Sequence, residues 1–170
     1  MPDRAEVKVI FFDVGDVLIV DCIGPKFDVL NEKYAIPRDQ LLALRKKYRQ
    51  QADLGLYSDP QFWQILLQEC GIAAQPEDWD LEPFYQEVPG TRGLVDRLRQ
   101  RGYRLAIITD DSREMAQARQ LRYGYQGLFE KVIVSSHLGI VKPDERIFHA
   151  ALQEMRSEER RVGKECRSRW

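Results

Sequence analysis

Short apolar runs alternate with longer stretches of helical periodicity over most of the chain. The run at 7–12 is rich in β-branched and aromatic residues and has no clean alternation of polar and apolar side chains. Such a run is typical of a strand that is buried on both faces, as in a parallel sheet. Shorter apolar runs at 105–108 and 131–134 predict a second and a third strand.

The stretch at 21–87 contains helical patterns only. Apolar residues recur at helical spacing around Phe27 and Leu41, and a capping-box pattern at Ser58 to Gln61 includes a proline in the first helical turn. Several short helices without a strand predict a helical unit with its own core, inserted after the first strand.

The strand–helix alternation resumes after this unit. A helix precedes the second strand, and another, with Asp111 or Ser112 as its N-cap, separates the second strand from the third. The element order predicts an α/β fold, a Rossmann-like parallel sheet core with an inserted α-helical unit. We assign 1–20 and 88–155 to the core and 21–87 to the insert.

Several local segments have specific interpretations. Residues 21–25 are expected to be a linker, 76–85 one short helix, and 135–142 a loop before the last helix. The basic cluster that contains Arg45 and Arg49 is interpreted as the solvated face of a helix.

Composition and charge exclude several classes of protein. A chain of 170 residues with 44% hydrophobic content is expected to form one domain, or a domain with a small insertion. No apolar run approaches a membrane span, and the basic-then-apolar-then-small pattern of a signal peptide is not seen, so neither is expected. A net charge of −1 without a basic face argues against nucleic acid. Cys22, Cys70 and Cys166 show no disulfide or metal spacing, so a cytoplasmic protein is expected. The oligomeric state is not indicated.

Polar groups follow each predicted strand. Asp13 follows the first strand, Thr109 ends the second, and Lys142 lies on the loop beyond the third. The carboxyl ends of parallel strands meet at one edge, where open α/β sheets bind ligands. Asp13 would attack a phosphoryl group, Thr109 would donate to a phosphoryl oxygen, and Lys142 would neutralise charge. Asp13 alone could also be a turn residue, and Gly15 is expected to permit a sharp turn after it.

Three motifs resemble those of the haloacid dehalogenase (HAD) superfamily, in the branch with a helical cap. They are DVGDVL at 13–18, IIT at 107–109 and GIVKPD at 139–144. The resemblance implies a Rossmann-like core, Mg²⁺, and hydrolysis through an aspartyl intermediate. Most members are phosphatases, so it implies a small phosphorylated metabolite as substrate. It also implies a cap over 21–87 and a Mg²⁺ site that includes Asp13 and the backbone carbonyl of Gly15.

The first motif departs from the pattern of the family's phosphatases. Gly15 stands where they usually carry an aspartate that acts as general acid and base. Asp16 is one place further on and is interpreted as a turn residue. We favour a Mg²⁺-dependent phosphatase with an aspartyl-phosphate intermediate. A 2-haloacid dehalogenase, whose halide leaves without a proton, and a non-catalytic protein that binds phosphorylated ligands stay as alternatives.

The segment at 156–170 differs from the rest of the sequence. It holds six basic and three acidic residues with almost no apolar ones, so we expect it to be disordered or a loosely attached helix. It resembles translated adapter or vector sequence. The family's fourth motif, a strand that ends in acidic Mg²⁺ ligands, does not follow Met155. We therefore expect a truncated reading frame, an exposed edge on the first strand, weak Mg²⁺ binding and little turnover.

Overall fold

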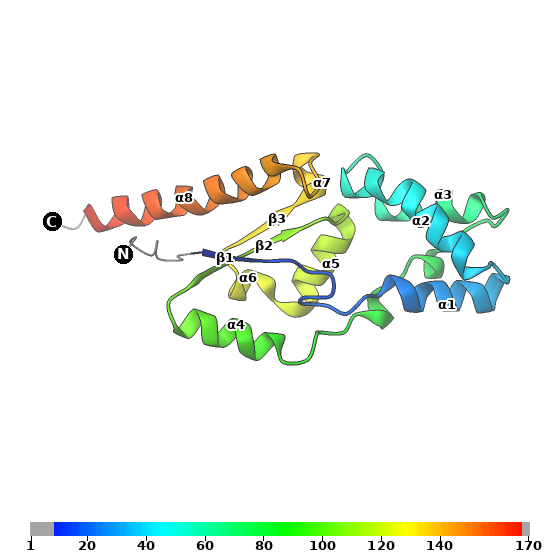
Figure 1. Cartoon of the computed structure of the whole chain (residues 1–170), viewed down its shortest axis with the longest axis horizontal. Helices are drawn as coiled ribbons and strands as arrows, with labels where there is room; N and C mark the ends of the chain where they lie inside the picture. Colours follow the sequence, from blue (N-terminus) through cyan, green and yellow to red (C-terminus); the bar gives the residue numbers. More distant parts are fainter. Residues whose placement is uncertain (1–8, 168–170) are drawn as a thin grey trace, which may run out of the picture.

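A computed structural model describes the backbone of residues 9–167 and the side chains of residues 9–156. Three short strands form one sheet, and helices surround it on both faces (Figure 1). The strands are β1 (Val9–Phe12), β2 (Arg104–Thr109) and β3 (Lys131–Val134). The helices are α1 (Ile23–Tyr34), α2 (Arg38–Asp53), α3 (Asp59–Gln68), α4 (Thr91–Gln100), α5 (Arg113–Tyr123), α6 (Tyr125–Leu128), α7 (Ser135–Leu138) and α8 (Glu145–Arg167), with 3₁₀ turns at Pro76–Asp78 and Glu82–Phe84.

The sheet has the strand order β1-β2-β3, and both pairings are parallel. Leu105 and Ile107 of β2 belong to a hydrophobic cluster with α4 and α6, whereas Ala106 and Ile108 belong to a cluster with α8. Because successive side chains of a strand point to opposite faces, β2 is covered on both sides. The prediction of a parallel sheet in an α/β fold is therefore confirmed. Among residues 9–167, β1 pairs with β2 alone and is an edge strand.

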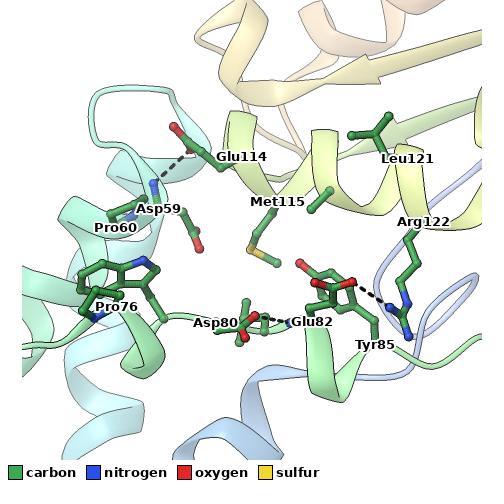
Figure 2. Close-up of a pocket in the computed structure, with 13 residues that line it drawn as sticks. Asp59, Pro60, Pro76, Asp80, Glu82, Tyr85, Glu114, Met115, Leu121 and Arg122 are labelled. Atoms are coloured by element: carbon green, nitrogen blue, oxygen red, sulfur yellow. Dashed lines mark hydrogen bonds and ion pairs between the residues drawn. The ribbon is translucent and has the colours of Figure 1, made fainter.

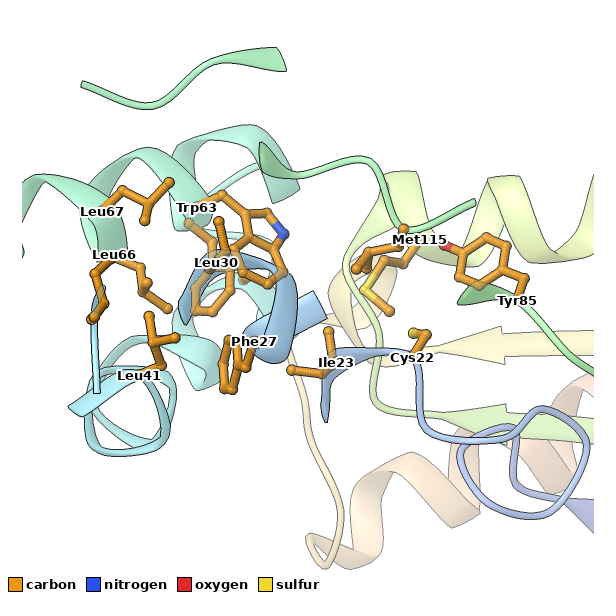
Figure 3. Close-up of a cluster of buried hydrophobic side chains, with 14 residues drawn as sticks. Cys22, Ile23, Phe27, Leu30, Leu41, Trp63, Leu66, Leu67, Tyr85 and Met115 are labelled. Atoms are coloured by element: carbon orange, nitrogen blue, oxygen red, sulfur yellow. The ribbon is translucent and has the colours of Figure 1, made fainter. Parts of the chain in front are cut away.

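Helices α1, α2 and α3 have a hydrophobic cluster of their own (Figure 3). The ring of Trp63 meets the rings of Phe27 and Phe62 edge-to-face, at centroid distances of 6.0 and 5.3 Å. All three of these side chains are fully buried. Tyr85 and Met115 extend the cluster toward the sheet, so the helical segment packs directly on α5.

Local expectations differ from the structure at three connecting segments. The expected linker at 21–25 already contains the first turn of α1, because the Asp21 carboxylate accepts hydrogen bonds from the N–H groups of Ile23 and Gly24. The single helix expected at 76–85 is two separate 3₁₀ turns, each with a proline near its start. The loop expected at 135–142 begins with the helical turn α7.

The last helix does not end where the composition changes. Backbone helix α8 continues without a break from Glu145 to Arg167, so the segment beyond Met155 is helical over most of its length. Its interpretation as vector-like sequence stays a prediction, and residues 168–170 lie outside the described part of the chain, as do Val7 and Lys8. None of the helices in the described range is both long and apolar enough to cross a membrane.

Gly55, just beyond the end of α2, lies against the backbone of α7. Its φ is +75°, and a Cβ at this position would lie 2.5 Å from the carbonyl oxygen of Ser136. We expect Gly55→Ala to lower the free energy of unfolding by about 2 to 3 kcal/mol, because alanine is strained in this conformation and would also displace the backbone.

Gly71 provides the matched control for this substitution. It also has a φ of +75°, but a Cβ there would meet nothing within 4 Å. Gly71→Ala should therefore cost about 1 kcal/mol, the conformational strain alone. Denaturant unfolding of both variants measures the difference, and equal losses would contradict a tight approach of Gly55 to α7.

Candidate active site

The carboxyl edge of the sheet brings two of the predicted groups into contact. Asp13 directly follows β1, and Lys142 lies on the segment between α7 and α8. The ammonium Nζ of Lys142 lies 2.6 Å from Oδ2 of Asp13. This ion pair joins residues 129 positions apart in the sequence. A cation beside the carboxylate is positioned to neutralise negative charge at the point where Asp13 would react.

Thr109 ends β2 at the same edge and is buried. Its hydroxyl donates a hydrogen bond of 3.0 Å to Oδ2 of Asp111. The adjacent Asp110 carboxylate accepts the backbone N–H of Lys142 at 3.0 Å. Burial raises the pKa of Asp110. Asp110 therefore holds the segment that carries Lys142 close to the end of β2.

These groups line a cavity of about 250 Å³ between the sheet edge and helix α2. The edge forms one wall and the C-terminal half of α2 contributes to the opposite one. Charged groups dominate, with six carboxylates and four cations among the lining residues. The lining residues are Asp13, Gly15, Asp16, Val20, Asp21, Ile23, Arg45, Arg49, Asp53, Thr109, Asp110, Asp111, Met115, Arg119 and Lys142.

A buried ion pair lies among the residues that line this cavity. Nη1 of Arg119 on α5 donates to both carboxylate oxygens of Asp111, at 2.8 and 2.9 Å. Nη2 of Arg119 lies 3.4 Å from the sulfur of Cys22, whose pKa is raised by burial. The N-cap of α5 is Ser112, which accepts the N–H of Met115. Of the two candidate caps, Ser112 therefore has that role, and Asp111 serves the ion pair.

Arg49 corrects the interpretation of the basic cluster as a solvated face. Its side chain is 12% exposed, and its guanidinium bridges Oδ1 of Asp53 at 2.8 Å and Oδ1 of Asp59 at 2.9 Å. The hydroxyl of Ser112 donates to the same oxygen of Asp59 at 2.9 Å. This network connects α2, α3 and α5. A charge run could not reveal it, because Asp59 and Ser112 come from other parts of the chain. Arg45 is exposed as expected.

The turn after Asp13 differs in detail from its expected form. The residue with a left-handed backbone is Asp16, at φ 56°, and not Gly15. The Asp16 carboxylate is exposed and accepts the N–H of Asp21 at 3.0 Å, as a turn residue does. A Cβ at Gly15 would meet nothing within 4 Å. The glycine at this position is therefore not required by packing.

A larger cavity of about 660 Å³ lies on the other side of Met115 (Figure 2). It lies between the start of α3, the 3₁₀ turns and α5, and its lining does not include Asp13, Thr109 or Lys142. Figure 2 shows Glu114 bonded to the backbone of Asp59 at its rim. The three predicted site residues therefore line the smaller cavity and not this one.

Within the described residues, no group of three or more His, Cys, Asp or Glu side chains is arranged to hold a metal ion. Asp13 and the Gly15 carbonyl supply one carboxylate and one backbone oxygen beside the cavity. Mg²⁺ keeps several waters and is often held by one or two carboxylates plus substrate phosphate, so this set fits Mg²⁺ as a partial site.

Sequence comparison identifies relatives of this chain. The model of the haloacid dehalogenase-like hydrolase family matches residues 7–164. The match extends into the segment that follows Met155. The chain is also similar to the glyceraldehyde 3-phosphate phosphatase of Pyrococcus abyssi, with 30% identity over 168 residues that cover 86% of this chain and 67% of that protein.

Solved structures show the same fold at lower identity. A HAD family enzyme of Bacteroides thetaiotaomicron superposes with a TM-score of 0.71 at 19% identity, covering 89% of this chain and 79% of that one. Another crystal structure of that enzyme contains magnesium and inorganic phosphate. The L-2-haloacid dehalogenase of Xanthobacter autotrophicus superposes with a TM-score of 0.62 at 18% identity, covering 88% and 65%.

Proposed function

Because the chain belongs to the haloacid dehalogenase-like hydrolase family, we propose that it hydrolyses the phosphate ester of a small metabolite. The contact of Lys142 with Asp13 at the sheet edge carries this proposal, because it joins a nucleophile to a cation suited to a phosphoryl group. The name of the Pyrococcus abyssi relative supports a phosphorylated substrate. A cavity of about 250 Å³ suits a ligand below drug size.

Asp13 is the proposed nucleophile. Its carboxylate attacks phosphorus, the ester oxygen leaves, and water then hydrolyses the aspartyl-phosphate to release inorganic phosphate. Lys142 neutralises negative charge on the transferred group. The Thr109 hydroxyl, once it turns from Asp111, donates to a phosphoryl oxygen.

Mg²⁺ is the proposed cofactor, held by the Asp13 carboxylate and the Gly15 carbonyl. When bound, it supplies positive charge that polarises the phosphoryl group. We further propose that the helical segment at 21–87 acts as a cap, with α2 excluding water from the cavity. A cytoplasmic location is also proposed, and the free thiols of Cys22 and Cys70 support it.

A substrate panel tests this function. The full chain is assayed with alkyl and aryl phosphate esters and with 2-chloropropionate, each in Mg²⁺ and in excess chelator. We expect slow phosphate release from the esters in Mg²⁺, in keeping with the missing fourth motif, and at least about 10-fold less in chelator, because the metal stabilises charge in the transition state. Halide release that persists in chelator would instead identify a dehalogenase. Binding of phosphate without turnover would identify a non-catalytic protein.

A further inference from the structure

The proposed phosphatase needs a proton for its leaving group. An alkoxide is a poor leaving group, and a positioned acid normally protonates it as the ester bond breaks. Gly15 supplies no side chain for this step, and the turn holds the exposed Asp16 carboxylate on a backbone N–H. The group that donates the proton must therefore come from elsewhere in the cavity.

The C-terminal end of α2 lies directly against the sheet edge. The hydroxyl of Ser135, the first residue after β3, donates to the backbone carbonyl of Asp53 at 2.6 Å and accepts the N–H of Asp111 at 3.1 Å. One side chain thus joins the end of α2 to the residue two places beyond Thr109. Two residues further along, Gly55 approaches the backbone of Ser136. Figure 1 shows this end of α2 next to α7.

The carboxyl group of Asp53 belongs to the cavity wall. Its side chain is 15% exposed, lines the cavity and contacts Nε of Arg49. The charged groups that act on it are Arg49 from its own helix and Asp110 and Asp111 from the end of β2. Burial, reinforced by the two aspartates, raises the pKa of Asp53 to about 6 despite Arg49. Arg45 and Lys142 line the same cavity.

Three other carboxylates that line the cavity are engaged in hydrogen bonds that hold the fold together. Asp111 accepts two hydrogen bonds from Arg119, and Asp110 accepts the N–H of Lys142. Asp21 accepts the first N–H groups of α1. Asp53 is the lining carboxyl on the helix that faces the sheet edge. An in-line displacement directs the leaving oxygen away from Asp13, and Asp53 lines the same cavity as that nucleophile.

We propose that Asp53 is the general acid and base of the reaction, supplied by α2 in place of a side chain at position 15. In the first step Asp13 forms a bond to phosphorus, the ester P–O bond breaks, and the carboxylic acid of Asp53 gives its proton to the leaving oxygen. In the second step the Asp53 carboxylate takes a proton from water as that water attacks phosphorus, and the P–O bond to Asp13 breaks to free its carboxylate. Inorganic phosphate leaves, and both aspartates return to their initial states. This inference rests on the proposed phosphatase function.

Leaving-group dependence tests this role. We compare the wild-type chain with Asp53→Asn on glyceraldehyde 3-phosphate and on p-nitrophenyl phosphate, whose phenolate leaves without a proton. We expect kcat/KM for the alkyl ester to fall by about 100-fold or more, and that for the aryl ester to change little. Asp39→Asn is the matched control, because Asp39 lies exposed in the first turn of the same helix.

The pH profile provides a second measurement. The protonated Asp53 is the active form in the first step, so wild-type kcat/KM for the alkyl ester should fall as the pH rises through about 6, the pKa of this group. That decline should be absent in Asp53→Asn. A purely structural role of Asp53 would lower both esters equally and leave the profile unchanged.

The outcomes separate this inference from the function on which it rests. Equal losses on both esters, or a leaving-group-dependent loss in Asp16→Asn and not in Asp53→Asn, would overturn the role of Asp53 and leave the phosphatase intact. Failure of the wild-type chain to hydrolyse either ester would overturn the phosphatase, and the role of Asp53 with it.

Discussion

Asp13→Asn should reduce phosphate release by at least about 1,000-fold, because an amide cannot form the aspartyl-phosphate on which both steps depend. The substitution preserves the size of the side chain and removes the charge next to Lys142 that is the proposed nucleophile and Mg²⁺ ligand. Initial rates on p-nitrophenyl phosphate measure the effect. Acid-quenched wild-type enzyme should yield a phosphorylated peptide that contains Asp13, and the variant should not.

The matched control for this experiment is Asp96→Asn. Asp96 is exposed on α4 and does not line the cavity, so its substitution should leave the rate unchanged. A rate for Asp13→Asn close to that of Asp96→Asn would show that Asp13 is not the nucleophile.

Arg119→Met should lower the free energy of unfolding by about 3 to 5 kcal/mol, because it leaves the buried Asp111 carboxylate without its cation. The side chains of Arg119 and Asp111 are 8% and 4% exposed. Solvent therefore cannot replace the lost hydrogen bonds. Denaturant unfolding, followed by circular dichroism, measures the change.

Arg122→Met is the matched control on the same helix. It removes the same charge from an exposed ion pair, so the difference between the two variants measures the effect of burial on the free energy of unfolding. Arg122 pairs with Glu82 at 3.0 Å, but these side chains are 42% and 70% exposed. Exposed pairs contribute about 1 kcal/mol or less, so this variant should be nearly as stable as the wild type. Similar losses in the two variants would argue that burial of the Asp111 pair does not matter for stability.

The contact of Asp13 with Lys142 at the sheet edge could be predicted from the sequence, because it depends on local patterns. Apolar runs locate the strands, and the parallel arrangement places the residues that follow them at a common edge. Asp13 and Lys142 could therefore be expected to meet, although 129 positions separate them. The roles of Asp13, Thr109 and Lys142 in the reaction stay predictions until the variants are assayed.

The residues of the opposite wall of the cavity could not be predicted from the sequence in this way. Arg49 belongs to a run of basic residues that looks solvated, and Asp53 ends a helix with no motif around it. Whether these side chains face water or the sheet depends on how α2 packs on α7 and α5, and that packing is set by contacts such as Gly55 with Ser136. Helical periodicity identifies a polar face but not its neighbour.

The sequence by itself determined the α/β order, the parallel sheet and the residues at its carboxyl edge, since each follows from periodicity within a few positions of the chain. Only the tertiary structure decided which charges are buried. Arg119 contacts Cys22 and Arg49 contacts Asp59 across different helices. The electrostatic state of a carboxyl such as Asp53 depends on burial and on charges brought near by folding, and neither quantity is encoded in its sequence neighbours.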